Sequence, residues 1–365
     1  MQEPMNKSVP FELVAALTVA AAMSGPAGAQ TFTHLQIVHP TPIVTPSDSI
    51  YEYAVPRKLG YFKQEGLEAS FDHSAGVVAS AQALQSGSAD FAVTNPEVIM
   101  QMREQGSDLV GIMTLKLDNG VIMAVMDDSP IKGLDDLRGK TIGGMSFGGG
   151  GGLLLTKLLA KKGMGPGDYS RVVTGVGGGA ATALRTHKVD AMILWDSAFA
   201  TFENAGLKLR YIRVPGEENM AGQLLATTER FIKKNPKAIE GVCRAIAKSL
   251  YFTRLDPAAT MPIFLDAFPE SIPSGADRAA VARDYTHVLK SYLKAGFKDT
   301  PLDARVGGFN EANWTFTKAF YVDAGMLKGT QPVTQAYTTQ FLDQCNDFDR
   351  KAVEADLQKY KAQSR

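Results

Sequence analysis

The sequence predicts an α/β protein built from two similar halves. Short strands alternate with helices of about ten to fifteen residues, which is typical of βαβ units and a parallel sheet. The pattern occurs twice, because Ala83-Leu84 followed by residues 90–93 resembles Ala183-Leu184 followed by residues 190–193. The 365 residues suffice for about two domains, each with a sizeable core.

The first half shows this alternation most clearly. We expect a strand at 35–38, a loop at 40–47, a helix at 51–60, a strand at 67–71, a helix ending near 85 and a strand at 91–93. Thr45, Pro46 and Asp48 give a capping hydroxyl, a proline at the first helical position and an acid at the third. Together they predict a helix start.

Two apolar strands are expected to connect the halves. Residues 119–126 could cross from the first to the second, and residues 224–226 could cross back. Thr227 or Thr228 can cap a helix that begins at residue 229. Later helices are predicted at 236–250, 279–293, 314–320 and 353–360, and we expect them to cover one half. The predicted lobes are therefore 30–117 with 222–365, and 118–221.

Charge and hydropathy exclude some classes of partner. The 38 basic and 38 acidic side chains balance, so the chain has no net field to attract nucleic acid or an anionic membrane. Charges or glycines interrupt the apolar stretches beyond the N-terminus, so none predicts a membrane-spanning helix. We expect no nucleic-acid partner.

The first 29 residues predict a secretory signal peptide. Lys7 is a weak basic region, residues 11–23 are mostly apolar, and Ala27-Gly28-Ala29 fits a small-x-small cleavage site. Cleavage after Ala29 would export the protein to the periplasm. Gln30 follows in place of a cysteine, which argues against a bacterial lipid anchor. Whether translation starts at Met1 or Met5 stays open.

Cysteines and histidines give no metal signature. In an oxidising compartment Cys243 and Cys345 could pair, but both lie in helical patterns, which favours two separate buried thiols. Two cysteines cannot build a structural zinc site. No ligand spacing connects the histidines, which are His34, His39, His73, His187 and His287. We therefore expect neither a metal nor a cofactor.

Three small-residue loops are the strongest candidates for a binding site. Residues 74–77, 145–152 and 175–179 each follow a predicted strand and run into a helix start. Ligands bind at this edge of an open α/β sheet. Glycines allow close backbone approach, and the free N–H groups of a first helical turn attract an anion. A flexible hinge is the alternative for the five glycines at 148–152.

Aromatic and acidic residues add candidates for ligand contact. Trp195 and Asp196 end an apolar strand, where they could stack on a ligand and accept a hydrogen bond from it. Alternatively, Trp195 packs in the core and Asp196 caps the next helix. Tyr51, Tyr53 and Phe147 are further stacking candidates, and we expect each to lie partly in the core.

A nucleotide-dependent enzyme is the rival interpretation. Residues 175–180 fit G-x-G-x-x-A, and Asp196 follows at about the spacing of a dinucleotide-binding motif. The unit lies mid-chain, however, and export would separate the protein from nicotinamide pools. The sequence contains no H-E-x-x-H or P-loop motif, so we expect no enzyme.

The chain resembles a known family. Residues 57–67, which read RKLGYFKQEGL, resemble the opening motif of the nitrate/sulfonate/taurine-type substrate-binding proteins of ABC importers. The similarity continues through residues 89–92, 129–140, 189–191 and 231–236. That group shares its fold with thiamine-pyrimidine precursor synthases. The resemblance implies a type II periplasmic binding protein fold, with two lobes, a ligand cleft between them and extra C-terminal helices.

The resemblance also implies a function and a ligand site. The protein would bind a small organic anion or zwitterion, such as a sulfonate, a taurine-like compound or an aromatic carboxylate. It would act as a monomer and pass the ligand to a membrane permease. The ligand contacts that carry over, with the stacking candidates, are Thr45, Ser47, Tyr51, Gly76, Val77, Thr94, Asn95, Ser146, Phe147, Gly148, Gly149, Trp195 and Asp196.

Two departures from the family limit this transfer. Trp-Glu-Pro is common where this chain has Trp195-Asp196-Ser197, and the shorter acid can reach different ligand atoms. The cysteine-rich C-C-C-x-C run of the precursor synthases is absent, which argues against that enzymatic role. A nitrogen heterocycle such as a thiamine-pyrimidine precursor stays open as the ligand, and ligand sensing stays open as the role.

Overall fold

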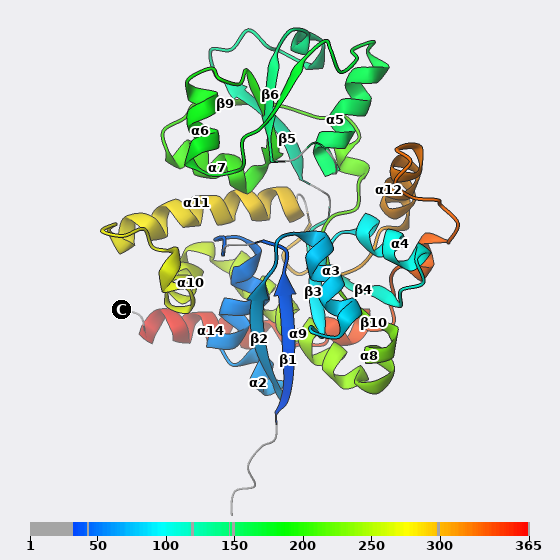
Figure 1. Cartoon of the computed structure of the whole chain (residues 1–365). Coiled ribbons are helices and arrows are strands. Elements are labelled where there is room, and N and C mark those ends of the chain that lie inside the picture. Colours follow the sequence, from blue (N-terminus) through cyan, green and yellow to red (C-terminus); the bar gives the residue numbers. More distant parts are fainter. Residues whose placement is uncertain are drawn as a thin grey trace, which may run out of the picture. The chain divides into compact units, whose positions relative to one another are not determined.

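The predicted α/β fold is confirmed by a computed structural model, which contains two five-stranded mixed sheets with helices around them (Figure 1). The structure describes residues 32–41, 44–117, 120–145, 147, 150–297 and 300–363. The predicted signal peptide lies outside these residues. Among the described helices, none is long and apolar enough to cross a membrane.

The first sheet has the strand order β2-β1-β3-β10-β4. Strand β1 pairs in parallel with β2 and β3, whereas β10 runs antiparallel to both β3 and β4. Its strands are β1 (Thr33–His39), β2 (Leu67–His73), β3 (Phe91–Thr94), β4 (Leu109–Thr114) and β10 (Leu224–Thr228).

The second sheet repeats this arrangement in the order β7-β6-β8-β5-β9. Strand β6 pairs in parallel with β7 and β8, and β5 runs antiparallel to β8 and β9. Its strands are β5 (Val121–Met126), β6 (Thr141–Gly144), β7 (Ser170–Val173), β8 (Ala191–Trp195) and β9 (Leu209–Ile212).

The antiparallel strand in each sheet arrives from the other one. Strand β5 follows β4 of the first sheet directly, and β10 follows β9 of the second. These are the two crossing strands that the sequence predicted. Each crossing strand enters its new sheet at the carboxyl ends of the parallel strands, so it runs antiparallel to them. Each sheet is therefore mixed instead of purely parallel.

The internal repeat has a physical basis in two aspartates. The Asp90 carboxylate accepts a hydrogen bond from Gln36 N at 2.8 Å, and Asp90 N donates to Gln36 O at 2.9 Å. Asp190 makes the same pair of bonds with Thr141, at 2.7 and 2.8 Å. Each aspartate therefore locks the start of its strand to the parallel neighbour.

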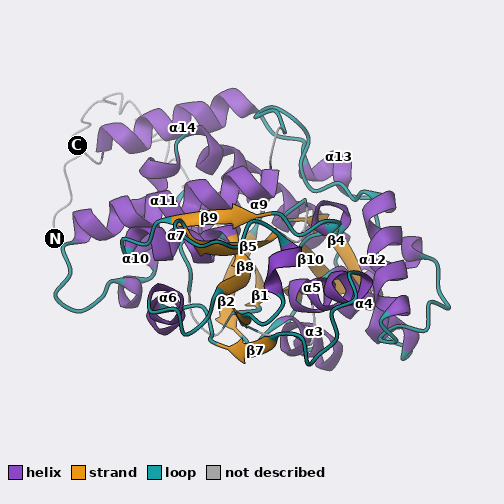
Figure 2. Cartoon of the chain, turned by 90° about the horizontal axis from the view of Figure 1, so that it is seen from above, coloured by secondary structure: helices purple, strands orange, loops and turns teal. Residues whose placement is uncertain are grey.

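Helices cover both faces of the first sheet. Figure 2 shows α3 on one side of its strands and α9 with α14 on the other. The later helices confirm the predicted helical third of the chain. The remaining bounds are α1 (Val55–Lys58), α2 (Tyr61–Gln64), α3 (Val77–Ser86), α4 (Pro96–Glu104), α5 (Gly150–Lys161), α6 (Gly178–Arg185), α7 (Asp196–Asn204), α8 (Glu229–Lys234), α9 (Pro236–Leu255), α10 (Met261–Ala267), α11 (Arg278–Phe297), α12 (Glu311–Asp323), α13 (Leu342–Cys345) and α14 (Arg350–Gln363).

One predicted helix cap is confirmed and another is wrong. Thr228 Oγ1 accepts from Phe231 N at the start of α8, as expected. Thr45, in contrast, shares a hydrogen bond with the hydroxyl of Ser47 at 2.9 Å. The helical conformation begins only at Asp48 and continues as a π-helical segment, η1 (Ile50–Ala54), into α1.

The preference for two separate thiols is also wrong, because Cys243 and Cys345 form a disulfide. Cys243 lies in α9 and Cys345 ends α13, and these two helices pack against each other. Their Cα atoms are 5.0 Å apart although the residues are 102 positions apart in sequence. Helical periodicity showed that both are buried but carried no information on which helices are neighbours.

Candidate functional site

The crossing strands bring the carboxyl ends of the parallel strands of both sheets to the same region. Strand β10 begins at Leu224, which pairs with Thr94 at the end of β3 and Thr114 at the end of β4. Strand β5 begins at Val121, which pairs with Trp195 at the end of β8. The predicted site residues Thr94 and Trp195 therefore each lie beside a crossing strand.

The three small-residue loops run into helix starts as predicted. Gly76 precedes α3, Gly150 begins α5 and Gly177 precedes α6. Gly76 has a φ of +137°, a backbone conformation that strongly favours glycine. Val77 O accepts hydrogen bonds from the Thr94 and Ser80 hydroxyls, which ties the start of α3 to β3.

Part of the five-glycine run is explained by packing. A Cβ atom on Gly151 would lie 2.0 Å from Val121 Cγ1, so the start of α5 packs directly on β5. We expect Gly151→Ala to lower the free energy of unfolding by about 1–3 kcal/mol, because the added methyl group overpacks this contact. Urea unfolding followed by circular dichroism measures the change.

Gly178→Ala is the matched control in the first turn of α6. No atom lies within 4 Å of the position that its Cβ would take. Alanine is the better helix former by about 1 kcal/mol, so this variant should be neutral or more stable. Equal losses in the two variants would contradict the packing explanation and favour a general need for flexibility.

Asp196 already has a cationic neighbour. It begins α7, and its Oδ2 lies 3.6 Å from Lys116 Nζ, with only 5% of the lysine side chain and 17% of the aspartate side chain exposed. The Ser291 hydroxyl of α11 donates to the Asp196 backbone oxygen at 3.3 Å. This acid therefore joins segments from both sheets. The alternative that Asp196 caps the next helix is wrong, because Trp195 is the N-cap of α7 and Asp196 is its first helical residue.

Sequence reasoning missed Lys116. It follows β4 in the link toward β5, and its ammonium lies 5.2 Å from the centre of the Tyr292 ring. Gly120 and Gly296 leave room for this side chain, since a Cβ on either would lie within 3.0 Å of a Lys116 atom. A lone lysine at the end of an otherwise apolar strand was the available signal.

A second missed feature is a buried cluster of His39, Asp48 and Glu52. His39 ends β1, and the two acids lie four residues apart on the following helical segment. His39 Nε2 lies 3.0 Å from Asp48 Oδ2 and 3.6 Å from Glu52 Oε2. All three residues are buried. The histidine spacing in the sequence gave no sign of this cluster, because the partners of His39 are acids.

Burial and mutual charge set the ionisation of this cluster. Burial and the negative charge of Asp48 raise the pKa of Glu52 to about 8. Burial alone would raise the pKa of Asp48, but His39 and hydrogen bonds from Ser47 and Ser49 lower it to about 2. The His39 pKa is opposed by burial yet raised overall by the two acids. At neutral pH the cluster therefore holds an Asp48–His39 ion pair beside a mostly protonated Glu52.

The predicted stacking candidates lie in different environments. Tyr51 is fully buried, and its hydroxyl donates to Leu115 O and contacts the Tyr292 hydroxyl. Tyr53 stacks on Phe71 in the same core. Phe147 and Trp195 are only half-buried, and Phe147 lies beneath the Arg171 guanidinium. Phe147 and Trp195 are therefore the better stacking candidates.

The remaining predicted residues fall into three groups. Thr45 and Ser47 lie together beside the buried cluster, because the Ser47 hydroxyl donates to Asp48. Asn95 precedes α4 and donates to Glu97 at 3.1 Å. The predicted contacts Ser146, Gly148 and Gly149 lie outside the described residues.

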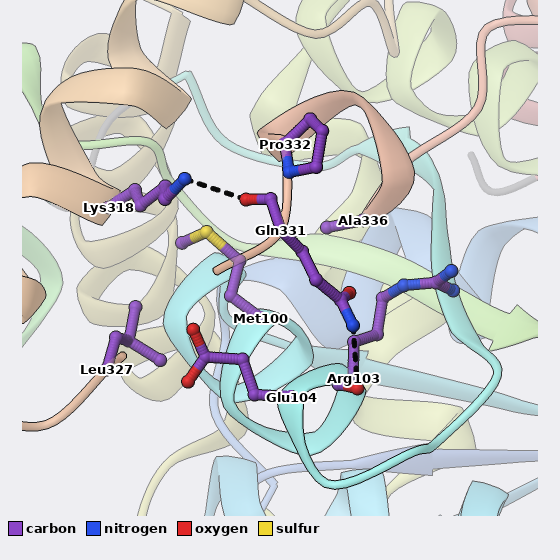
Figure 3. A pocket seen from close by; sticks show the side chains of 8 residues that line it. All are labelled: Met100, Arg103, Glu104, Lys318, Leu327, Gln331, Pro332 and Ala336. Carbon is purple, nitrogen blue, oxygen red and sulfur yellow. Dashed lines mark hydrogen bonds between the residues drawn. The ribbon is translucent and has the colours of Figure 1, made fainter. Parts of the chain in front are cut away.

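A small pocket away from the strand ends carries no sign of function (Figure 3). Its polar groups connect α4 to a later loop. The Glu104 carboxylate accepts from the backbone N–H groups of Lys328 and Gly329, and Lys318 Nζ donates to Gln331 O at 2.7 Å. The Gln331 amide donates to Arg103 O in turn. These contacts are structural.

A family model described as NMT1/THI5 like matches residues 49–260, more than half of the chain. The chain belongs to this family. The match begins at Ser49, one residue before η1, and runs through β10 and α9. It includes the whole second sheet, both crossing strands and every strand of the first sheet except β1. It confirms the resemblance found in the sequence.

Among curated proteins, the riboflavin-binding protein RibY of Chloroflexus aurantiacus is 26% identical over 302 residues, covering 81% of this chain and 83% of RibY. The periplasmic aliphatic sulphonate binding protein SsuA of Escherichia coli superposes with a TM-score of 0.63 at 17% identity, over 83% of this chain and 91% of SsuA. The periplasmic nitrate-binding protein NrtA of Synechocystis PCC 6803 superposes with a TM-score of 0.62 at 11% identity, over 90% of this chain and 98% of NrtA. The fold is that of periplasmic substrate-binding proteins of ABC importers.

Proposed function

We propose that this protein is the exported solute-binding subunit of an ABC importer and binds a planar nitrogen heterocycle non-covalently between its two sheets. The observation that carries the choice of ligand is a hydrogen-bond acceptor, Asp196, which follows Trp195 at the end of β8. Its side chain is 17% exposed, and Lys116 Nζ lies 3.6 Å from its Oδ2. An acid at this position favours a ligand with N–H donors over a simple anion.

Two further observations support a heterocycle. Trp195 and Phe147 are half-buried, so each keeps part of a ring available for stacking on a planar ligand. RibY, which shares about a quarter of its residues with this chain, carries riboflavin binding in its name. A flavin or a related pyrimidine ring has both the planar face and the ring N–H that this site could recognise.

A small organic anion or zwitterion is the second candidate, as the family resemblance implies. Gly76 and Gly177 precede helices α3 and α6, and the space beside each is open. The N–H groups of such helix starts can hold a sulfonate or carboxylate. A zwitterion would satisfy both these donors and the Asp196 carboxylate.

The proposed role is binding and delivery, without catalysis. The mature chain would act as a monomer in the periplasm and pass its ligand to a membrane permease. Loss of ligand uptake in cells that lack the protein would support transport. Unchanged uptake with a lost transcriptional response would instead support ligand sensing.

A thermal-shift panel with the purified mature chain tests the ligand class. Riboflavin, a thiamine-pyrimidine compound, taurine, an alkanesulfonate and an aromatic carboxylate are compared at equal concentration. We expect the heterocycles to raise the melting temperature most, because only the native state binds them. A shift with the sulfonates alone would overturn the heterocycle proposal and leave the binding function intact.

Replacing Trp195 by alanine should weaken binding of the best ligand by about tenfold, because stacking on the indole is lost. Isothermal titration calorimetry measures the change. Tyr211→Ala on β9 is the control, since Tyr211 is also a half-exposed aromatic residue of the second sheet but hydrogen-bonds Glu203. An equal loss in both variants would argue against a contact by Trp195.

A further inference from the structure

Three potential metal-ligand atoms converge at the end of β1. His39 Nε2 lies 3.0 Å from Asp48 Oδ2 and 3.6 Å from Glu52 Oε2, and the ligand atoms of the three residues all lie within 4.8 Å of one another. Around a tetrahedral zinc ion with bonds of about 2.0–2.2 Å, ligand atoms lie roughly 3.3–3.6 Å apart. The observed spacing needs only a small adjustment to reach this geometry.

The outer atoms of two ligands are already held in place. His39 Nδ1 hydrogen-bonds Thr41 Oγ1 at 2.9 Å, which leaves Nε2 directed at the acids. Asp48 Oδ1 accepts from the Ser47 hydroxyl at 2.8 Å and from Ser49 N at 3.0 Å, which leaves Oδ2 directed at His39. Hydrogen bonds of this kind orient the ligands in metal sites.

Glu52 supplies an independent observation that points to a cation. Its side chain is 2% exposed, and within the described residues neither of its oxygens accepts a hydrogen bond. Buried carboxyl groups are nearly always hydrogen-bonded, paired or bound to a metal, because burial of an unsatisfied polar group is costly.

We propose that His39, Asp48 and Glu52 bind a divalent transition-metal ion, with Zn²⁺ the best match to one imidazole nitrogen and two carboxylate oxygens. Calcium and magnesium prefer six or more oxygen ligands, which this set does not provide. The ion would fasten the carboxyl end of β1 to the helix that begins at Asp48. The proposal holds whichever solute the protein carries.

Zinc titration of the metal-depleted mature chain tests the site. We expect one zinc per chain by calorimetry and elemental analysis, and a higher melting temperature with zinc present. Glu52→Gln and Asp48→Asn keep the side-chain shape but remove the charge. Each should weaken zinc binding by about 100-fold or more, since even outer contacts of metal sites are worth about 10–100-fold.

His287→Asn is the control, because His287 forms an exposed pair with Glu203 at 3.3 Å and should not affect the stoichiometry. Failure of the wild-type chain to bind zinc, or unchanged affinity in both acid variants, would overturn the proposal. If a variant does not fold, X-ray absorption spectroscopy of the zinc-loaded wild type identifies the atoms that bind the zinc ion. A shell of oxygens with one imidazole supports the site, and a shell without imidazole contradicts it.

Discussion

Replacing Cys243 and Cys345 together by alanine should lower the free energy of unfolding by about 2–5 kcal/mol. The disulfide joins residues 102 positions apart, so it removes a large loop entropy from the unfolded chain. It also holds α13 on α9, next to the core of the first sheet. Guanidinium unfolding of the oxidised wild type and of the double variant measures the difference.

Reduction provides the control for this prediction. Dithiothreitol should destabilise the wild type by a similar amount and leave the double variant unchanged. A wild-type chain whose two thiols are shown to be free after reduction, yet whose stability is unaltered, would contradict a structural role for the bond.

Lys116→Met should destabilise the protein by about 3–5 kcal/mol, because it removes the cation beside the largely buried carboxylate of Asp196. Methionine preserves most of the aliphatic stem, so the loss reports mainly on the charge. Equilibrium unfolding in urea measures it. The same variant should also weaken ligand binding if Asp196 contacts the solute.

Two comparisons make this result interpretable. Lys237 pairs with Glu240 on the surface with 88% of its side chain exposed, so Lys237→Met should change stability by no more than about 0.5 kcal/mol. Adding Asp196→Asn to Lys116→Met should restore part of the lost stability, since no uncompensated charge remains. A Lys116→Met variant as stable as Lys237→Met would contradict the ion pair's structural importance.

The fold was predictable because the sequence patterns that specify it are local and occur in both halves of the chain. Alternating strand and helix patterns located the elements, and the repeated aspartates Asp90 and Asp190 marked equivalent strand starts in both halves. The crossing strands followed from their apolar composition and their position between the halves. The composition could not show that β5 and β10 run antiparallel to their neighbours. The direction of a strand depends on the end of the sheet at which the preceding connection enters.

The candidate site was only partly predictable, because its charged residues meet through tertiary structure. The helix starts at Val77 and Gly178 followed from glycine loops, which are local signals. Lys116 and Asp196 come from different sheets, and no spacing in the sequence relates them. Asp48 and Glu52 do lie one helical turn apart, but only the end of β1 brings His39 to them.

The most direct test of the account is equilibrium binding followed by recovery of the ligand. The mature chain is dialysed against a nitrogen heterocycle, and the bound solute is then released by denaturation and identified by mass spectrometry. We predict one equivalent of ligand per chain, recovered chemically unchanged after prolonged incubation. Recovery of a converted product, or no saturable binding of any solute in the panel, would contradict a solute-binding function.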